Sequence, residues 1–479
     1  MNYKNIINRS NVWLCLICAP IFILFVFTFI GYKGNGYVYL LFSVASNTLL
    51  YFGFRKNALF FDAFIAVFFW LGFWLKLSYR VTFANGTFLH AVGSFNATGQ
   101  AFDQALLVTS CGFFGLIIAS YIREKLIFKY PEKSSETGLA GLYQIYNNYR
   151  KLILTGFVIL FIFVAVTNLY FGIYQRGTIS KIDLPYGLKG VFTWFLLFGG
   201  ASFSALILHF EFIKNKNTSY LVVALSLFES FSSNISLLSR GMILNTSALA
   251  YGVFKSLKFN SILSNYRFLI ISLSLFLFLF GSSVLLVNQF RYKITYEPVP
   301  NTNSVTSGVE SSLNEHEALI LRLFVDRWVG IEGILAVSSY PEKGWKLWRD
   351  AWQETFAYHE NTFYDKYLID SPYQNKFAMD KHSVSMPGIL AYCYYPGSFL
   401  FLFFCMLSIG LIGALIEISV YKLGGKNLIL CALLAQVVAY RYAHFGYVPR
   451  QSFLLFGALY LNLFIFYFTN KLIVFVSKK

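Results

Sequence analysis

The residues best suited to chemistry in this sequence are arginines that stand close to carboxylates and glycines. The stretch from Arg322 to Gly333 places Asp326 and Glu332 within reach of two arginines. An arginine at the centre of a bilayer costs about 2.5 to 3.5 kcal/mol even on the mildest scale, so these side chains must face water, protein or an anion. A planar guanidinium forms paired hydrogen bonds to phosphate, so converging arginines are suited to binding a diphosphate.

An arginine-to-glycine spacing occurs twice. Ten residues separate Arg176 from Gly187, and ten separate Arg322 from Gly333. The other arginines that we expect on the same side of a membrane are Arg80, Arg240, Arg291, Arg327, Arg441 and Arg450. Each could bind an anion, or it could snorkel to the membrane surface or pair with a carboxylate. Arg240 is the least able to snorkel or to find a carboxylate, since it stands in a tight turn between two apolar segments.

Several histidines and carboxylates near these arginines could accept a proton. His444 lies between Arg441 and Arg450, and the loop that holds the second arginine pair also contains His316, Glu317 and Glu332. The Glu315-His316-Glu317 triplet could instead bind a divalent cation. Since the chain shows no second cluster of metal ligands, we expect no metal and no other cofactor.

The composition is that of a polytopic membrane protein. Of 479 residues, 57% are hydrophobic and only 13% are charged, whereas soluble proteins have about 25% charged residues. Apolar runs of about 20 residues recur, each long enough to cross ~30 Å of hydrocarbon as a helix, and the alternating pattern of a membrane β-barrel is absent. We predict an all-α fold with about 12 transmembrane helices, at roughly 12–30, 37–54, 58–78, 105–122, 152–171, 189–210, 218–238, 241–254, 268–287, 388–420, 428–445 and 452–470.

Lysines and arginines in the short loops predict the orientation. Twenty fall on the side that holds both termini and nine on the other, which places the termini in the cytoplasm and residues 288–387 in a large outer loop. The chain thus divides into helices 1 to 9 (1–287, with 218–254 the least regular), the loop (288–387) and helices 10 to 12 (388–479). The loop is rich in aromatics, so we expect it to fold, with helices near 310–337 and 342–358. The tryptophans at 345, 348 and 352 could lie in the membrane interface or stack on sugar rings.

The sequence argues against two other classes of protein. The net charge of +17 arises from loop residues that orientation explains, so we expect no nucleic-acid partner. Asp62, Glu229 and Glu417 lie within apolar segments, as in proton-coupled transporters, but they are few and the chain shows no repeated halves.

Further short motifs accompany the paired arginine-to-glycine spacing. They are Asn168-Leu-Tyr-Phe-Gly172-Ile-Tyr-Gln-Arg176-Gly177, Ser239-Arg240-Gly241, Asp326-Arg327-Trp328 with Glu332-Gly333, Met386-Pro-Gly388, and Tyr394-Tyr-Pro-Gly397. Together with the span number and the large late loop, they resemble the Wzy-type O-antigen and oligosaccharide-repeat-unit polymerases.

The resemblance implies an inverting glycosyltransferase of the bacterial inner membrane. It would transfer a glycan from undecaprenyl diphosphate to the next lipid-linked repeat unit at the periplasmic face. Arg176, Arg240, Arg322 and Arg327 would stabilise the leaving diphosphate, and His316, Glu317 or Glu332 would take the hydroxyl proton. The residues left to bind diphosphate or glycan are Arg80, Arg291, Arg441, His444, Arg450, Gly187 and Gly333. Membrane lipids surround such an enzyme, and a chain-length regulator and a flippase are candidate partners.

Two rival functions stay open at this point. An O-antigen ligase would use the same donor and pass the glycan to lipid A-core. A flippase or other transporter of lipid-linked oligosaccharides would carry charged residues through its span interiors, whereas here the charges gather at one side.

Overall fold

The computed structural model describes residues 18–89, 92–131, 138–182, 184–215, 220–239, 241–256, 266–295, 325–356, 361–369 and 384–477. Within these ranges the chain forms helices joined by turns, with no β-strand, so the all-α prediction is confirmed for the described chain. Four predicted site residues, Arg240, His316, Glu317 and Arg322, lie outside the described residues.

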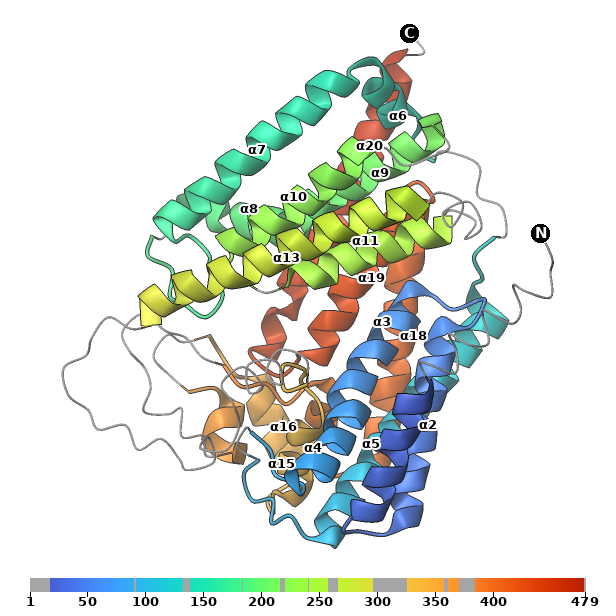
Figure 1. Ribbon diagram of the computed structural model, residues 1–479, viewed down its shortest axis with the longest axis vertical. Helices are drawn as coiled ribbons and strands as arrows, with labels where there is room; N and C mark the ends of the chain where they lie inside the picture. Colours follow the sequence, from blue (N-terminus) through green and yellow to red (C-terminus); the bar gives the residue numbers. More distant parts are fainter. Residues whose placement is uncertain are drawn as a thin grey trace.

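Helices occur at every predicted span (Figure 1). The first helix of the described residues is the apolar helix Cys18–Gly31. The helices that follow are α2 (Gly36–Phe54), α3 (Phe60–Phe69), α4 (Lys76–Ala84), α5 (Gly99–Ile122), α6 (Ala140–Asn148), α7 (Arg150–Phe171), α8 (Leu188–Trp194), α9 (Gly200–Asn215), α10 (Tyr220–Ser236), α11 (Met242–Ser256), α13 (Tyr266–Thr295), α15 (Ile331–Ser339), α16 (Trp345–Trp352), α17 (Ile389–Cys393), α18 (Phe399–Leu423), α19 (Leu428–Ala443) and α20 (Ser452–Ser477). Turns of π-helix join α3 to α4 and α8 to α9 without a break.

Eight helices in the described part of the chain are long and apolar enough to cross a membrane. They are Gly36–Phe54, Phe60–Ala84, Gly99–Ile127, Arg150–Phe171, Pro185–Lys214, Ile270–Arg291, Phe399–Leu423 and Pro449–Ser477. The other predicted spans coincide with shorter helices, of which α10 has 17 residues and α11 has 15. A perpendicular crossing needs about 20 residues. The eight long helices identify a membrane protein, and twelve crossings stay a prediction.

Helix α19 joins the two groups of helices that Figure 1 shows. It packs against α3 and α18 of the lower group and against α9 and α11 of the upper group. Twelve of its sixteen residues are buried. Asn427 caps its first turn by accepting from Ile429 N and Leu430 N, and it also donates to Ala205 O at 3.1 Å. These bonds fix the start of α19 against α9 of the upper group.

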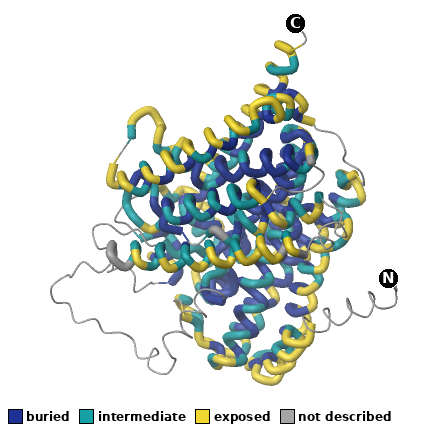
Figure 2. Tube along the Cα trace, turned by 45° about the horizontal axis from the view of Figure 1, so that its top comes forward, coloured by how far each residue is buried: buried dark blue, intermediate teal, exposed yellow. Residues whose placement is uncertain are grey.

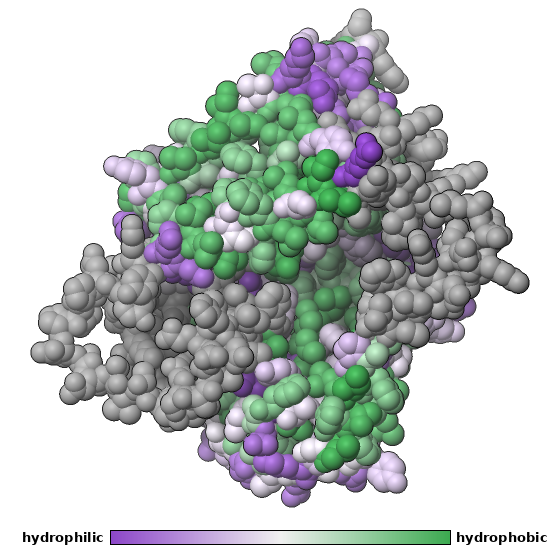
Figure 3. Space-filling model, viewed as in Figure 1, coloured by the Kyte–Doolittle hydropathy of each residue, from purple (hydrophilic) through white to green (hydrophobic). Residues whose placement is uncertain are grey.

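Burial and hydropathy follow the pattern expected of helices in a bilayer. Figure 2 shows buried residues where the helices face one another and exposed residues on their outer sides. In Figure 3, apolar side chains cover most of the visible helix surface, and hydrophilic ones gather near the C-terminal end of the molecule and at its opposite end. The exposed apolar surface is the part that lipid would cover.

The structure corrects two helix predictions. The span predicted at 388–420 is divided, because Tyr394–Ser398 forms a turn with Gly397 at a φ of 76° between α17 and α18. Of the helix predicted over 310–337, residues 310–324 lie outside the described residues, while 325–330 form a turn and α15 begins at Ile331. Lys76 takes the carbonyl oxygens of Asp326 and Trp328, which are then less available for helical hydrogen bonds.

Candidate functional site

The first of three parts of the site is the turn that follows α7 and contains Arg176. Gly172 ends α7 at a φ of 60°, and the buried side chain of Asn168 donates to Tyr174 O and Ser236 O at 3.0 and 2.9 Å. The Arg176 amide donates to Leu237 O at 2.9 Å. These bonds tie the turn to the end of α10, so the position of Arg176 is set by backbone contacts rather than by its guanidinium.

Arg291, at the end of α13, reaches the same place. Its Nε donates to Leu238 O at 2.9 Å, and its Nη2 donates to Arg176 O at 3.4 Å. Arg291 therefore supports the backbone around Arg176. No carboxylate of the described residues forms an ion pair with the Arg176 guanidinium.

The second part of the site is the turn 325–330 of the large loop. This turn lies against α4. Lys76 is fully buried, and its Nζ lies 2.6 Å from Glu332 Oε2. Arg80, one helical turn further along α4, forms a second ion pair with Asp326 at 2.6 Å. Two carboxylates of the loop are thus engaged by two cations of one helix, with Arg327 between them in sequence.

The third part is the end of α19, with Arg441 in its last turn and His444 directly after it. Arg441 Nη2 donates to Ser452 Oγ at 2.9 Å, and its guanidinium lies 5.7 Å from the centre of the Phe445 ring. Arg450 is exposed in the short turn Pro449–Gln451. In the described part of the chain, no acidic side chain forms an ion pair with either arginine.

His444 is the residue around which these three parts meet. It is the first residue past the end of α19, and burial lowers the pKa of its imidazole to about 3, with a further lowering from the nearby charges of Arg176, Arg327 and Lys76. Its Nδ1 lies 3.2 Å from Tyr440 O, which can only accept, so Nδ1 carries the hydrogen and Nε2 keeps a lone pair. The imidazole is therefore neutral, and its Nε2 is able to accept a proton.

Aromatic rings connect the loop turn to this histidine. Trp328 stacks on Phe68 with ring centres 5.8 Å apart, and Phe68 meets Tyr440 edge-on at 5.8 Å. Tyr440 in turn stacks on His444 at 4.0 Å. The position of the turn and that of the histidine are coupled through this packing.

The two glycines of the repeated spacing have different physical roles. Gly333 has no room for a side chain, because a Cβ would lie 2.0 Å from Pro387 O of the Met386–Gly388 segment. Gly187 has open space around it but a φ of 72°, which L side chains rarely adopt. Backbone packing thus explains Gly333 and backbone conformation explains Gly187, and their role in binding a ligand stays a prediction.

We expect Gly333→Asn to destabilise the protein far more than Gly187→Asn does. At Gly333 a side chain forces backbone apart, a strain of about 1 to 3 kcal/mol or more. Asparagine tolerates the left-handed conformation required at Gly187. Thermal unfolding of the two purified variants measures the difference, and equal midpoints would show that the Gly333 contact is not tight.

The sequence missed Lys76 and Glu354 as parts of this region. Lys76 lies within the predicted span 58–78, where a lysine indicates a buried partner. Glu354 accepts from Phe363 N at 2.6 Å and from Val448 N at 2.9 Å, so it ties the loop to the segment after His444. Burial raises the pKa of Glu354, and the two backbone hydrogen bonds oppose that shift. No local pattern reveals either contact.

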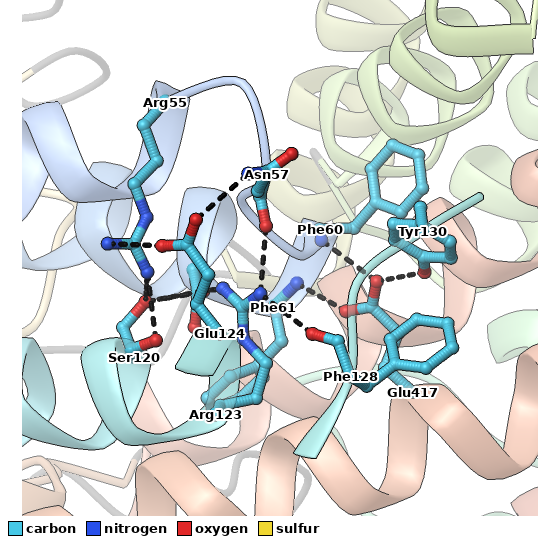
Figure 4. A network of polar contacts seen from close by, with 11 residues as sticks. Arg55, Asn57, Phe60, Phe61, Ser120, Arg123, Glu124, Phe128, Tyr130 and Glu417 are labelled. Carbon is cyan, nitrogen blue, oxygen red and sulfur yellow. Dashed lines mark hydrogen bonds and ion pairs between the residues drawn. The ribbon is translucent and has the colours of Figure 1, made fainter. Parts of the chain in front are cut away.

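The carboxylates within apolar segments have structural partners. Asp62 pairs with Arg123 at 2.5 Å, and Glu417 accepts from Phe60 N and Phe61 N at the start of α3 and from Tyr130 Oη (Figure 4). Glu229 accepts from Ser230 and Ser233, both at 3.1 Å. Each of the three is held by hydrogen bonds that a proton carrier would have to break.

The described residues contain no group of three or more histidine, cysteine or acidic side chains that could hold a metal ion. No protein-family model, curated protein or solved structure matches the chain. The class that the fold itself defines, for the described part of the chain, is an all-helical membrane protein.

Proposed function

We propose that the protein is a glycosyltransferase that polymerises lipid-linked oligosaccharide repeat units, as the family it resembles does. The observation that carries the proposal is the packing of the loop turn 325–330 against the segment of His444 through Trp328, Phe68 and Tyr440, together with an Arg176 guanidinium with which no carboxylate of the described residues forms an ion pair. In this proposal the chain crosses a bacterial inner membrane twelve times, both termini lie in the cytoplasm, and the loop 288–387 lies in the periplasm.

The reaction needs a fixed positive charge at the leaving group. The acceptor hydroxyl attacks the anomeric carbon of the donor, and the bond from that carbon to the diphosphate oxygen breaks. Undecaprenyl diphosphate leaves with the electron pair, and its charge grows as the bond breaks. Arg176 and Arg441 suit this role best, because no carboxylate of the described residues pairs with them. Arg80 and Lys76 are already paired with loop carboxylates.

The hydroxyl proton needs an acceptor, and His444 is the best placed of the described candidates. Its Nε2 carries the lone pair, whereas Glu332 is engaged by Lys76. With a pKa of about 3, His444 is a weak base in the free enzyme. A bound diphosphate would bring negative charges close to Arg176 and Arg327, and these would raise the pKa of His444 towards its ordinary value. The donor would thereby help to activate the base.

Purified protein in lipid nanodiscs, mixed with synthetic undecaprenyl diphosphate repeat units, tests the proposal. We expect a ladder of lengthened glycans on a gel. Transfer only after lipid A-core is added would make the protein a ligase instead. If neither acceptor is used but labelled lipid-linked oligosaccharide crosses the bilayer of proteoliposomes, the protein is a transporter.

Chain extension should respond to acid differently in the free enzyme and in the donor complex. We expect kcat/KM to stay level as pH falls from 8 to 5, because His444 stays neutral in the empty site. Since the bound diphosphate raises the pKa, kcat should fall at a higher pH than kcat/KM does. His444→Gln should remove the acid limb and lower kcat by about 100-fold or more. Profiles that coincide would show that the donor does not act on His444.

A further inference from the structure

We propose that Lys76, assisted by Arg80, is a positioning residue that holds Arg327 in the site without contacting substrate. The expected effect of Lys76 on the rate of glycan extension rests on the proposed function. Its expected effect on the structure of the turn does not depend on any activity. The inference begins with three positions spaced by four residues, Gly72, Lys76 and Arg80, all of which meet the turn 325–332.

The contacts at these positions are close and specific. Gly72 and Gly330 approach so nearly that a Cβ on either would lie within 2.3 Å of a backbone atom of the other segment. Lys76 Nζ donates to Trp328 O at 2.5 Å, to Asp326 O at 3.1 Å and to Glu332 Oε2 at 2.6 Å. One ammonium group thus satisfies all three of its donors on one turn. A π-helical turn, Trp70–Leu75, immediately precedes Lys76, and such turns occur frequently at functional sites.

The contacts of Lys76 and Arg80 fix the position of Arg327. Asp326 and Trp328 flank Arg327, and both of their carbonyl oxygens are held by Lys76. Arg80 adds its ion pair with the Asp326 side chain at 2.6 Å. Since both peptide neighbours of Arg327 are held, its backbone cannot move away from His444 without breaking a buried ion pair.

The charge of Lys76 is neutralised by Glu332, whereas no carboxylate of the described residues pairs with Arg176. The two cations therefore have different roles. A cation already bonded to three protein acceptors and without exposed surface cannot also bind a diphosphate. Its substitution should therefore affect the reaction through the position of Arg327. A misplacement of about 1 Å in a catalytic constellation costs about 100-fold in rate.

The first test is hydrogen–deuterium exchange of the full chain in nanodiscs. In Lys76→Met we expect the amides of residues 325–333 to exchange at least about tenfold faster, since the contacts that close the turn are lost. Amides of α18 should be unchanged. Lys33→Met is the matched control, because Lys33 is exposed and donates only to Asn85 O. If Lys76→Met does not fold, Arg80→Gln removes only the ion pair with Asp326 and should speed exchange of the same segment.

The second test is a double-mutant cycle in glycan extension. We expect Lys76→Met to lower the rate by about 100-fold, and Lys76→Met/Arg327→Ala to be no less active than Arg327→Ala alone. Unchanged exchange at 325–333, or losses that simply add, would overturn the inference. If the wild-type protein extends no glycan, the proposed function fails, and the exchange measurement still decides whether Lys76 holds the turn.

Discussion

Replacing Arg176 by alanine is expected to lower glycan extension by about 100- to 1,000-fold while leaving the fold intact. Removal of one preorganised donor to a developing negative charge has an effect of this size. The turn around Arg176 is held by its own backbone and by Asn168, so the guanidinium contributes little to folding. The measurement is the initial rate of extension with a fixed donor and a single acceptor, together with the unfolding temperature.

Two further variants show whether the effect belongs to this guanidinium. Arg176→Lys keeps the charge but loses the planar pair of donors, so its rate should lie between those of the wild type and Arg176→Ala. Arg349→Ala is the matched control, because Arg349 is 66% exposed on α16 and lies 3.9 Å from Asp350. An Arg176→Ala variant that keeps more than a tenth of the wild-type rate would remove Arg176 from the reaction.

The sequence predicts the helices of this protein well because the bilayer constrains them. A run of about 20 apolar residues has few structures available to it in hydrocarbon other than a helix. Helices α2 and α7 therefore begin and end within a few residues of the predicted limits. The break at Gly397 was missed because the residues on both sides of it are apolar, and hydropathy alone does not detect a turn between them.

The site is harder to predict, because its contacts join residues that are distant in the chain. Lys76 and Glu332 are separated by 256 residues, and no local spacing predicts their ion pair. The arginine-to-glycine spacing places Arg176 at the site, but for Gly333 it marks close backbone packing. Arg327 was predicted on a helix and lies in a turn, because Lys76 takes two of the carbonyl oxygens that a helix would use.

The 25-residue helix Phe60–Ala84 connects the site to a second polar cluster, which we expect to matter for stability alone. Asp62 near its start and Lys76 near its end are 14 residues apart, or roughly 20 Å at 1.5 Å per residue. Figure 4 shows the network near the start of this helix, in which Arg123, Arg55 and Glu124 meet. The distribution of lysines and arginines predicts that these residues lie on the cytoplasmic side, opposite to His444.

Arg123→Met is expected to destabilise the protein by about 3 to 5 kcal/mol, because it leaves the carboxylate of Asp62 buried without its cation. The two side chains are 1% and 9% exposed, and their atoms lie 2.5 Å apart. The less buried pair of Arg55 and Glu124, with side chains 14% and 15% exposed, is the matched comparison, and Arg55→Met should cost about 1 kcal/mol. Denaturant unfolding in detergent micelles measures both.

The double variant Asp62→Leu/Arg123→Met distinguishes two causes of the lost stability: a carboxylate left buried without a cation, and the loss of the contacts that Arg123 makes. If the cost of Arg123→Met comes from the unpaired carboxylate, removing that carboxylate as well should recover much of the stability, because apolar residues of similar size can replace a buried ion pair. The extension rate at low temperature should stay within about twofold of the wild type in both variants, since the network touches none of the cations around His444. A double variant less stable than Arg123→Met would instead mean that the hydrogen bond from Ser120 to Asp62, at 2.6 Å, holds the start of α3 without help from the arginine.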